Sequence, residues 1–262
     1  MAPAVPQIAE LVAPADWRTV DFISDLHLQA SEPATFAAWQ TYMRETPADA
    51  VFILGDLFDV WVGDDAVDSD PSGFDAQCAQ VLQQAGRRLA LFVMHGNRDF
   101  LLGRPLMTLC GSTLLDDPTV LEFAGQRWLL SHGDALCLDD VDYMRFRDQV
   151  RSRDWQSAFL AQPLAERQAI AQGLRRQSRE QHDRRRQSGE AWIDVNAAAA
   201  RQWLQAANAP VLIHGHTHQP ATHTLGDGLQ RVVLSDWEAD ATPPRLEVLR
   251  LDAAGLRRIP PG

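Results

Sequence analysis

Short apolar runs alternate with longer stretches of mixed polarity along most of the chain. Several of the runs are rich in β-branched or aromatic residues, which is typical of buried strands: 19–23, 50–54, 89–94, 127–131, 211–214 and 231–235. Residues 35–45 and 75–86 have helical composition and predict strand–helix–strand crossovers. Residues 119–123 lie close to the run at 127–131 and predict a hairpin with it. The pattern therefore predicts an α/β fold with two packed mixed β-sheets flanked by helices.

The strand pattern disappears between residues 139 and 208, where helix-forming residues dominate. Pro163 stands where a first helical turn can begin, Ser188 and Gly189 interrupt the helical pattern, and residues 191–207 resume it. We therefore predict a helical insertion at 139–208 in a core made of residues 18–138 and 209–252. Residues 1–17 and 253–262 are predicted to be terminal extensions.

Charge is divided unevenly between this insertion and the rest of the chain. Residues 143–186 hold eleven Arg against five acidic residues, a local net charge of +6, whereas the whole chain carries -11. The same segment also contains aromatic and large aliphatic residues. Two interpretations stay open: an amphipathic helix pair that packs on the core, or a cap over the active site that meets an anionic, apolar ligand.

Composition excludes several classes of protein. A broadly acidic surface repels nucleic acid and anionic membranes, so the sequence predicts no nucleic-acid partner. Cys78, Cys110 and Cys137 are odd in number and lack C-x-x-C spacing, which argues against a disulfide framework or a thiolate zinc site. No apolar run approaches the roughly 20 residues that span a bilayer, and residues 1–17 lack the features of a signal peptide. We expect a cytoplasmic protein that does not cross the membrane.

Five short motifs in fixed order carry the chemistry: D-L-H, G-D, G-N-R-D, S-H-G-D and G-H-T-H. Each ends or follows an apolar run, so one edge of the fold can collect their side chains. A hydrolytic metal pair needs oxygen and imidazole ligands and a carboxylate that bridges the ions. The motifs supply such a set, and we predict a dinuclear metal site made of Asp25, His27, Asp56, Asn97, His132, His216 and His218.

Each residue of these motifs, taken alone, also has a less specific structural interpretation. Aspartates that cap turns and histidines on the surface would explain any one motif, and Gly96-Asn97 is good turn chemistry. The whole set in order is what indicates metal. Other polar residues near the motifs are expected to support loops or to orient ligands: Asp59, Asp64, Asp65, Asp99, Asp134, His95, His182, His214 and His223.

With these motifs in place, the chain resembles the calcineurin-like metallophosphoesterases, whose blocks are D-x-H, G-D, G-N-[H/R], a lone H and G-H-x-H. Within that superfamily it is similar to the UDP-2,3-diacylglucosamine pyrophosphatases of Gram-negative lipid A synthesis. The closer likeness rests on FISDLHL (22–28), LGDLFDVWVGDD (54–65), MHGNRDF (94–100), SHGDALCLDD (131–140), DVN (194–196) and IHGHTHQP (213–220). The resemblance implies a calcineurin-like α/β/β/α fold with a helical cap.

Arg98 distinguishes the closer family. Most of the superfamily has His after this Asn, whereas the pyrophosphatases have Arg, as here. An arginine does not give up its proton at neutral pH, so its expected catalytic role is electrostatic: a planar fork that binds phosphate oxygens and stabilises transition-state charge.

The resemblance also implies ligands and a reaction. Asp25, His27, Asp56 and His218 would bind one Mn2+, and Asp56, Asn97, His132 and His216 the other, although Zn2+ or Fe2+ would also suit the donors. Metal-activated water would attack the α-phosphorus of UDP-2,3-diacylglucosamine, giving UMP and 2,3-diacylglucosamine 1-phosphate (lipid X). The implied substrate contacts are Asn97, Arg98, Asp140, Ser178, His182, Arg185 and His216.

Two of these contacts depart from the family pattern. His182 stands where an amide side chain is common and Arg185 where a lysine is common, in a chain that contains no lysine. The basic, apolar insertion would hold the lipid-linked UDP-sugar and contact the cytoplasmic face of the inner membrane. Two alternatives remain: a calcineurin-like phosphodiesterase that acts on a soluble nucleotide or phosphoester, and a scaffold without metals. The sequence predicts no oligomeric state.

Overall fold

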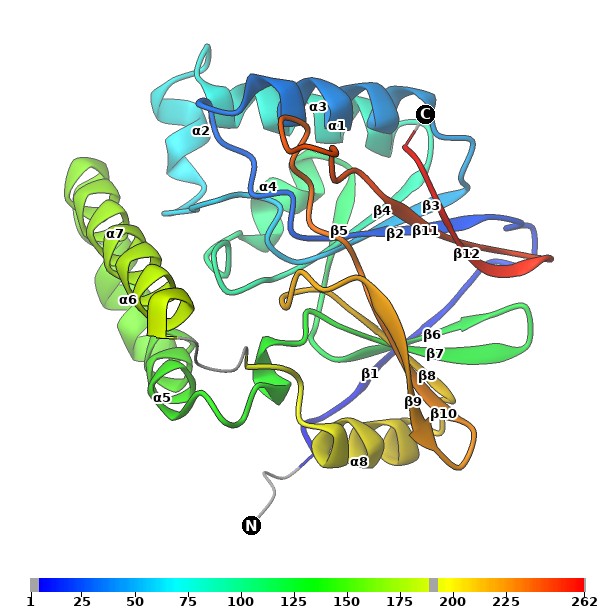
Figure 1. The fold of residues 1–262 in the computed structure, drawn as a ribbon. Coiled ribbons are helices and arrows are strands. Elements are labelled where there is room, and N and C mark those ends of the chain that lie inside the picture. The colour runs from blue at the N-terminus through cyan, green and yellow to red at the C-terminus, as the bar shows by residue number, and fades with distance from the viewer. Residues whose placement is uncertain (1–4, 189–192, 262) are drawn as a thin grey trace.

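Two six-stranded β-sheets pack face to face, and helices cover their outer faces (Figure 1). The computed structural model describes residues 5–188 and 193–261, and within this part it leaves aside the side chains of residues 179, 181–183 and 185–188. This layered arrangement confirms the predicted α/β fold with two packed mixed sheets.

The first sheet has the order β12-β11-β2-β3-β4-β5. Its parallel part consists of β2 (Val20–Ile23), β3 (Ala50–Leu54), β4 (Ala90–Met94) and β5 (Ser112–Leu115). Its antiparallel edge consists of β11 (Val248–Asp252) and β12 (Gly255–Ile259). The parallel strands are linked by helices, as their crossovers require: α1 (Pro33–Glu45), α2 (Asp65–Ser69), α3 (Phe74–Gly86) and α4 (Arg104–Leu109). Buried side chains of α1 and α3 cover its outer face.

The second sheet has the order β1-β6-β7-β8-β10-β9. Its strands are β1 (Ala9–Val12), β6 (Thr119–Phe123), β7 (Gln126–Ser131), β8 (Val211–His214), β9 (Ala221–Gly226) and β10 (Leu229–Val233). The predicted hairpin is β6–β7, which turns at Ala124 and Gly125 with φ of 52° and 74°. Positive φ at both central residues gives a two-residue turn the twist that the flanking strands need.

Apolar side chains from both sheets fill the space between them. Phe52 stacks on Phe92 with ring centroids 4.6 Å apart and lies 5.4 Å from Phe22. Leu130 and Ile213 of the second sheet belong to the same buried cluster. Burial of side chains of this size contributes about 1.5–3 kcal/mol each to the free energy of unfolding. This core fixes how the two sheets face each other, and with them the loops at the strand ends.

Both ends of the chain, which we expected to be extensions, add edge strands. β1 pairs in parallel with β6, and β12 pairs with β11. These strands are only half-buried and mix charged with apolar residues. Their stability comes from pairing with a neighbour, and a short sequence pattern does not reveal such pairing.

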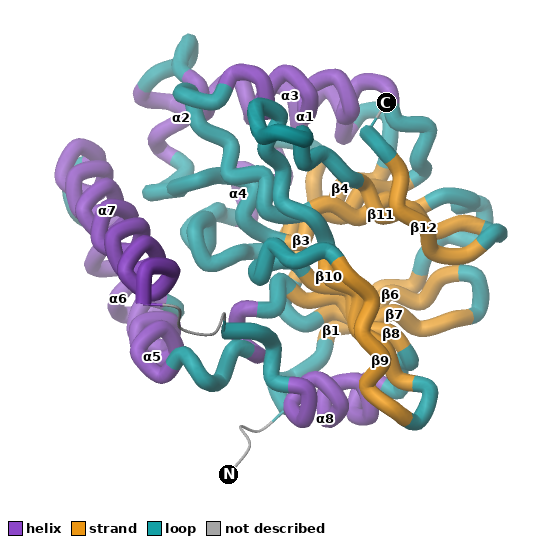
Figure 2. The backbone as a smooth tube through the Cα atoms, in the orientation of Figure 1, coloured by secondary structure: helices purple, strands orange, loops and turns teal. Residues whose placement is uncertain are grey.

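The predicted insertion contains two different structural parts. The helices α5 (Val141–Val150), α6 (Arg153–Leu160) and α7 (Leu164–Ser188) stand to one side of the sheets, and loops fill the space between them and the strands (Figures 1 and 2). In contrast, α8 (Ala197–Ala207) packs on the second sheet through buried Ala200, Trp203 and Leu204. We call α5–α7 the cap and count α8 with the core layer. Among the described residues, none of the helices has both the length and the apolarity to span a bilayer.

A buried arginine anchors the cap to the core. Arg167 of α7 is 2% exposed and donates hydrogen bonds to the carbonyl oxygens of Val62, at 2.5 Å, and Gln162, at 3.0 Å. Its guanidinium group also binds both carboxylate oxygens of Asp65. An added Cβ on Gly63 would lie 2.3 Å from Arg167 Nη1, so a glycine is needed for this close approach.

Replacing Arg167 with methionine is expected to loosen the cap without unfolding the sheets. The change leaves acceptors without donors, which costs about 1–3 kcal/mol. Hydrogen exchange should therefore accelerate in α7 and stay unchanged in β3 and β4. Arg176→Met, an exposed position on the same helix, is the control. Equal exchange in the two variants would contradict the anchoring role.

Candidate metal centre

The seven predicted ligands all follow the carboxyl ends of strands. Asp25 and His27 follow β2, Asp56 follows β3 and Asn97 follows β4, so four of them come from the first sheet. The other three come from the second sheet: His132 after β7, and His216 and His218 after β8. The set therefore lies where the two sheets meet, a position that gathers ligands in open α/β sheets.

One group of candidate ligands consists of Asp25, His27 and His218. One ligand atom from each lies within 4.8 Å of the others. His27 Nε2 and His218 Nε2 are 3.1 Å apart, and His218 Nε2 is 3.3 Å from Asp25 Oδ1. Two imidazole nitrogens and a carboxylate oxygen therefore point at the same place.

A second group consists of Asp25, Asp56 and His132, whose ligand atoms also lie within 4.8 Å of one another. Asn97 extends this group because its Oδ1 lies 3.0 Å from His132 Nε2 and 2.8 Å from His216 Nδ1. All seven predicted ligands thus belong to one continuous cluster.

Asp25 belongs to both groups, and Asp56 of the second group also faces His27 of the first. The Oδ2 of Asp56 is 3.9 Å from His27 Nδ1, and its Oδ1 is 3.8 Å from His132 Nε2. The backbone N–H of Arg98 donates to Oδ1 at 2.9 Å and helps to fix the carboxylate. The two oxygens of one buried side chain therefore face ligands on both sides, as a bridging carboxylate must.

Five of the seven candidates have left-handed backbone conformations. The φ angles are 54° at Asp25, 48° at His27, 52° at Asp56, 68° at His216 and 53° at His218. This region is unfavourable for residues with a side chain, and such strain concentrates at functional sites. The fold accepts the cost at these positions and thereby aims the side chains inward.

Glycines let the backbone pass close to the cluster. A Cβ on Gly55 would lie 2.5 Å from His132 Nδ1, and one on Gly215 would lie 2.3 Å from Asp25 Oδ2. A Cβ on Gly96 would come within 2.0 Å of Asp56 Oδ1 and 2.2 Å of the Asp56 backbone nitrogen. The glycine in three of the motifs is therefore a steric requirement of the site.

Gly96→Ala is expected to displace Asp56 and weaken metal binding by about 10-fold or more, with a loss of about 1–3 kcal/mol in stability. Calorimetric metal titration and denaturant unfolding measure both effects. The matched control is Gly173→Ala on α7, where a Cβ meets nothing within 4 Å. An alanine in a helix should leave that control as stable as the wild type or more so. Unchanged metal affinity in Gly96→Ala would show that the steric account is wrong.

Neighbouring groups hold the ligands in place. His132 Nδ1 lies 2.9 Å from the carbonyl oxygen of Leu54, so Nε2 is the nitrogen that faces the cluster. Asp99, which we expected to orient ligands or Arg98, accepts hydrogen bonds from the backbone N–H groups of Gly96 at 2.7 Å and Leu57 at 2.8 Å. It therefore ties together two of the ligand-bearing loops.

Asp134 connects the cluster to the cap. It accepts a hydrogen bond from the Tyr143 hydroxyl at 2.6 Å and pairs with Arg147 at 2.8 Å, both on α5. The Tyr143 ring stacks on His216 with centroids 5.8 Å apart. A cap residue thus touches a candidate ligand directly.

Electrostatics distinguish the histidines of the cluster. Burial lowers the pKa of His216 to about 3 and, with the nearby Arg98 charge, holds the pKa of His27 well below its usual value. Burial also lowers the pKa of His132, but the carboxylates of Asp56 and Asp25 outweigh it and raise the pKa to about 9. At neutral pH His27 and His216 are therefore neutral and ready to donate a lone pair.

The donor set suits a divalent cation. His27 Nδ1 is buried and has no hydrogen-bond partner, an arrangement that costs free energy unless another group binds there. The Asp56 carboxylate lies 3.9 Å from this nitrogen, and the cluster as a whole offers carboxylate, amide and imidazole donors. Cys78, Cys110 and Cys137 are buried and lie outside the ligand groups.

Arg98, for which we predicted a catalytic role, lies beside the cluster. Its Nε is 3.4 Å from Asp56 Oδ2, and its Nη1 is 2.5 Å from Asp59 Oδ1. Two predicted substrate contacts lie in the cap region: Asp140 caps the start of α5 and accepts from the Tyr143 N–H at 3.3 Å, and Ser178 is half-buried on α7. His182 and Arg185 belong to the same helix, but their side chains lie outside the described residues.

Other histidines have partners away from the cluster. His95 contacts the carbonyl oxygen of Leu102 at 2.7 Å, His214 lies 3.4 Å from Arg231, and His223 is on β9. Asp236 is a neighbour of the cluster that we did not predict. Its Oδ2 lies 3.9 Å from His218 Nδ1 and 2.9 Å from Arg245 Nη2. Its signal was available, because Asp236 also follows a strand end.

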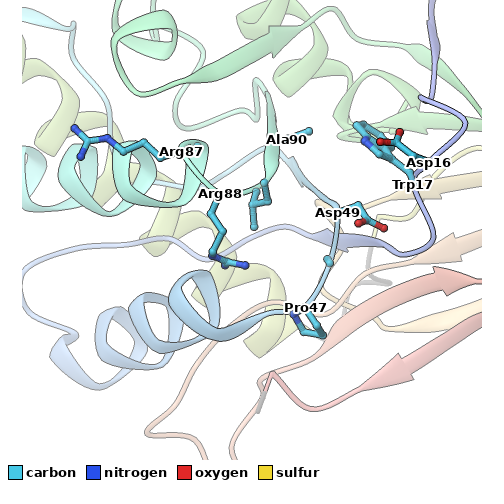
Figure 3. A pocket seen from close by; sticks show the side chains of 10 residues that line it. Asp16, Trp17, Pro47, Asp49, Arg87, Arg88 and Ala90 are labelled. Carbon is cyan, nitrogen blue, oxygen red and sulfur yellow. The ribbon is translucent and has the colours of Figure 1, made fainter.

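A large hollow lies elsewhere on the protein. It has a volume of about 550 Å3 and is lined by residues that precede β2 and β3 and by residues just before and at the start of β4 (Figure 3). The cluster follows the other end of these strands. Asp49 accepts there from the backbone of Arg18 and Thr19, and Arg88 donates to backbone carbonyls. These polar groups are used by the fold itself.

The chain matches a known protein family and several named relatives. The family model described as calcineurin-like phosphoesterase matches residues 18–220. A UDP-2,3-diacylglucosamine hydrolase of Chromobacterium violaceum is 46% identical over 251 residues, covering 93% of this chain and 99% of the relative. Proteins of the same name from Cellvibrio japonicus and Ralstonia nicotianae are each 45% identical, covering 82% and 92% of this chain and 90% and 92% of the relatives. The chain therefore belongs to the calcineurin-like phosphoesterase family, in the branch that contains the UDP-2,3-diacylglucosamine hydrolases.

Proposed function

We propose that this protein hydrolyses the pyrophosphate bond of UDP-2,3-diacylglucosamine to UMP and 2,3-diacylglucosamine 1-phosphate, a step of lipid A synthesis. The observation that carries the proposal is the convergence of seven ligand-type side chains beside Arg98 at the junction of the sheets. The names of relatives that match nearly the whole chain support the choice of substrate.

We assign two divalent cations to the cluster, with Mn2+ as the expected metal. Asp25, His27, Asp56 and His218 would hold one, and Asp56, Asn97, His132 and His216 the other. The positions of the two Asp56 oxygens and the unpartnered His27 Nδ1 support this division. Oxygen and imidazole donors without thiolate suit Mn2+, although Zn2+ and Fe2+ also bind such sets.

The cations and the surrounding residues would have different roles in the reaction. When bound, the cations neutralise charge on phosphate oxygens and lower the pKa of water. Two N–H groups of the Arg98 guanidinium would donate to two phosphate oxygens and stabilise the negative charge that develops in the transition state. Its pairing with Asp59 fixes the guanidinium plane near Asp56. Asn97 and His216 would contact substrate from the cluster itself.

The cap would bind the lipid part of the substrate. Val141, Leu160, Ile170 and Leu174 are exposed by 39 to 53% and lie on or beside cap helices rich in arginine. Apolar side chains suit acyl chains, and arginines suit phosphate. Asp140, Ser178, His182 and Arg185 would supply polar contacts. We further propose that the cap touches the cytoplasmic face of the inner membrane, where such a lipid resides.

The decisive experiment measures Mn2+-dependent release of UMP from UDP-2,3-diacylglucosamine in detergent micelles. UDP-N-acetylglucosamine, which lacks the acyl chains, is the matched substrate control. Release from the diacylated substrate alone supports the proposal. Equal rates with both substrates would favour a phosphodiesterase for soluble nucleotides, and no release with either would reject the proposal.

Metal binding is expected to release protons and to weaken as the pH falls. His132, with a pKa near 9 in the metal-free protein, is protonated at neutral pH but must be neutral to bind a cation. The apparent affinity should therefore rise about tenfold per pH unit below this pKa for each proton released. Calorimetry in two buffers of different ionisation enthalpy counts the protons. An affinity that is independent of pH would contradict the raised pKa.

A further inference from the structure

Asp59 lies between two arginines that come from different parts of the fold. It follows β3 by five residues, is 8% exposed, and accepts from Arg98 Nη1 at 2.5 Å. Arg175, on α7 of the cap, donates to the same carboxylate through Nη2 at 2.5 Å and Nε at 3.2 Å. One carboxylate thus binds a guanidinium group of the core and another of the cap through charge-assisted hydrogen bonds.

The two arginines would separate without this carboxylate. Burial lowers the pKa of Arg175, and the positive charge of Arg98 lowers it further, so the two cations are close enough to repel. Two guanidinium groups and one carboxylate leave a net charge of +1. Arg98 also lies 3.4 Å from Asp56 Oδ2, so this charge faces the candidate metal ligands.

The cap has a second arginine–aspartate pair that serves as a comparison. Arg167 and Asp65 join the same helix to the same loop of the core, but Asp65 has a 59% exposed side chain. Among the interactions described for it, the partner is Arg167 alone. Asp65 therefore binds the cap alone, whereas Asp59 binds the cap and also Arg98, which lies beside the cluster.

We propose that Asp59 is a positioning residue that keeps Arg98 and Arg175 together as a pair of cations for the diphosphate of the substrate, and so seats α7 over the metal centre. A diphosphate carries enough negative charge to accept from both guanidinium groups at once. The inference rests on the proposed function, because the pair needs a diphosphate between the cap and the cluster.

Asp59→Asn tests this role, because it removes the charge and keeps the shape. We expect kcat/KM for UDP-2,3-diacylglucosamine to fall about 10- to 100-fold, the cost of misplaced catalytic groups. Mn2+ affinity should not change, because Asp59 is not one of the assigned ligands. The matched variant Asp65→Asn should stay within about 3-fold of the wild type, because Arg167 keeps its bonds to the carbonyl oxygens of Val62 and Gln162 and an amide oxygen at position 65 can still accept from it.

A double-mutant cycle separates positioning from a merely structural role. If Asp59 acts through Arg98, Asp59→Asn should lower kcat/KM much less in an Arg98→Lys background than in the wild type. The proposal would be overturned if the loss of kcat/KM in the double variant equalled the product of the two single-variant losses. Wild-type kinetics in Asp59→Asn would overturn it as well.

A second measurement keeps the proposal testable if the substrate assignment is wrong. Hydrogen exchange of α7 around Arg175 should accelerate in Asp59→Asn whatever the substrate is. A wild type that releases no UMP rejects the proposed function, whereas unchanged exchange in α7 rejects the link through Asp59.

Discussion

Replacing Asp56 with alanine should reduce kcat/KM by about 1,000-fold or more, because in the proposed assignment this carboxylate would bridge the two cations that stabilise the transition state. The variant should also bind less Mn2+, measured by metal analysis after dialysis. Asp56 has one oxygen near His27 and the other near His132, so its removal takes a carboxylate oxygen from both sides of the cluster. We expect this to be the largest effect of any single substitution.

The folded state should survive this change. Burial raises the pKa of Asp56, which means that the ionised carboxylate is less favourable in the folded protein than in the unfolded chain. The metal-free variant should therefore unfold at the same temperature as the metal-free wild type or higher. Asp16→Ala, at an exposed position in the distant hollow, is the control for activity. Retained activity in Asp56→Ala would remove the basis of the metal assignment.

Substitution of Arg98 should give the second largest effect and a different signature. Arg98→Gln should lower kcat about 100-fold, comparable to the loss of one oxyanion donor. Arg98→Lys should recover only part of this, because an ammonium group keeps the charge but lacks the planar fork. Steady-state kinetics with the diacylated substrate measure both.

Metal content should distinguish the Arg98 variants from Asp56→Ala. Both Arg98 variants should retain full Mn2+, since a guanidinium group does not bind cations. Arg104→Gln is a suitable control, because its pair with Asp116 is exposed by more than 60% on both sides. Full recovery in Arg98→Lys would mean that charge alone is required and that the fork geometry is not.

The central strands could be predicted from sequence because burial on both faces makes them mostly apolar, with Asp21 in β2 as an exception. β3 has the predicted bounds, and β2 and β4 each begin one residue later than predicted. β9 and β12 escaped prediction because edge strands are half-polar and owe their conformation to a partner. The role of α8 also escaped, since helical composition does not reveal which surface a helix will cover.

The candidate ligands could be predicted because each is tied to a strand end. Contacts between distant loops could not. Arg175 and Tyr143 are ordinary residues in the sequence, and only the placement of the cap brings Arg175 to Asp59 and Tyr143 to His216. Asp236 is intermediate, because it follows a strand but its distance from His218 depends on the packing of two loops.

The origin of the ligands in both sheets has a consequence for biosynthesis. His27 and His218 are 191 positions apart, yet their imidazole nitrogens lie 3.1 Å from each other. A nascent polypeptide therefore cannot complete the ligand set until the ribosome has passed residue 218 and β8 has joined its sheet. A truncated product that ends before β8 would therefore lack His216 and His218 and could not form the complete candidate set.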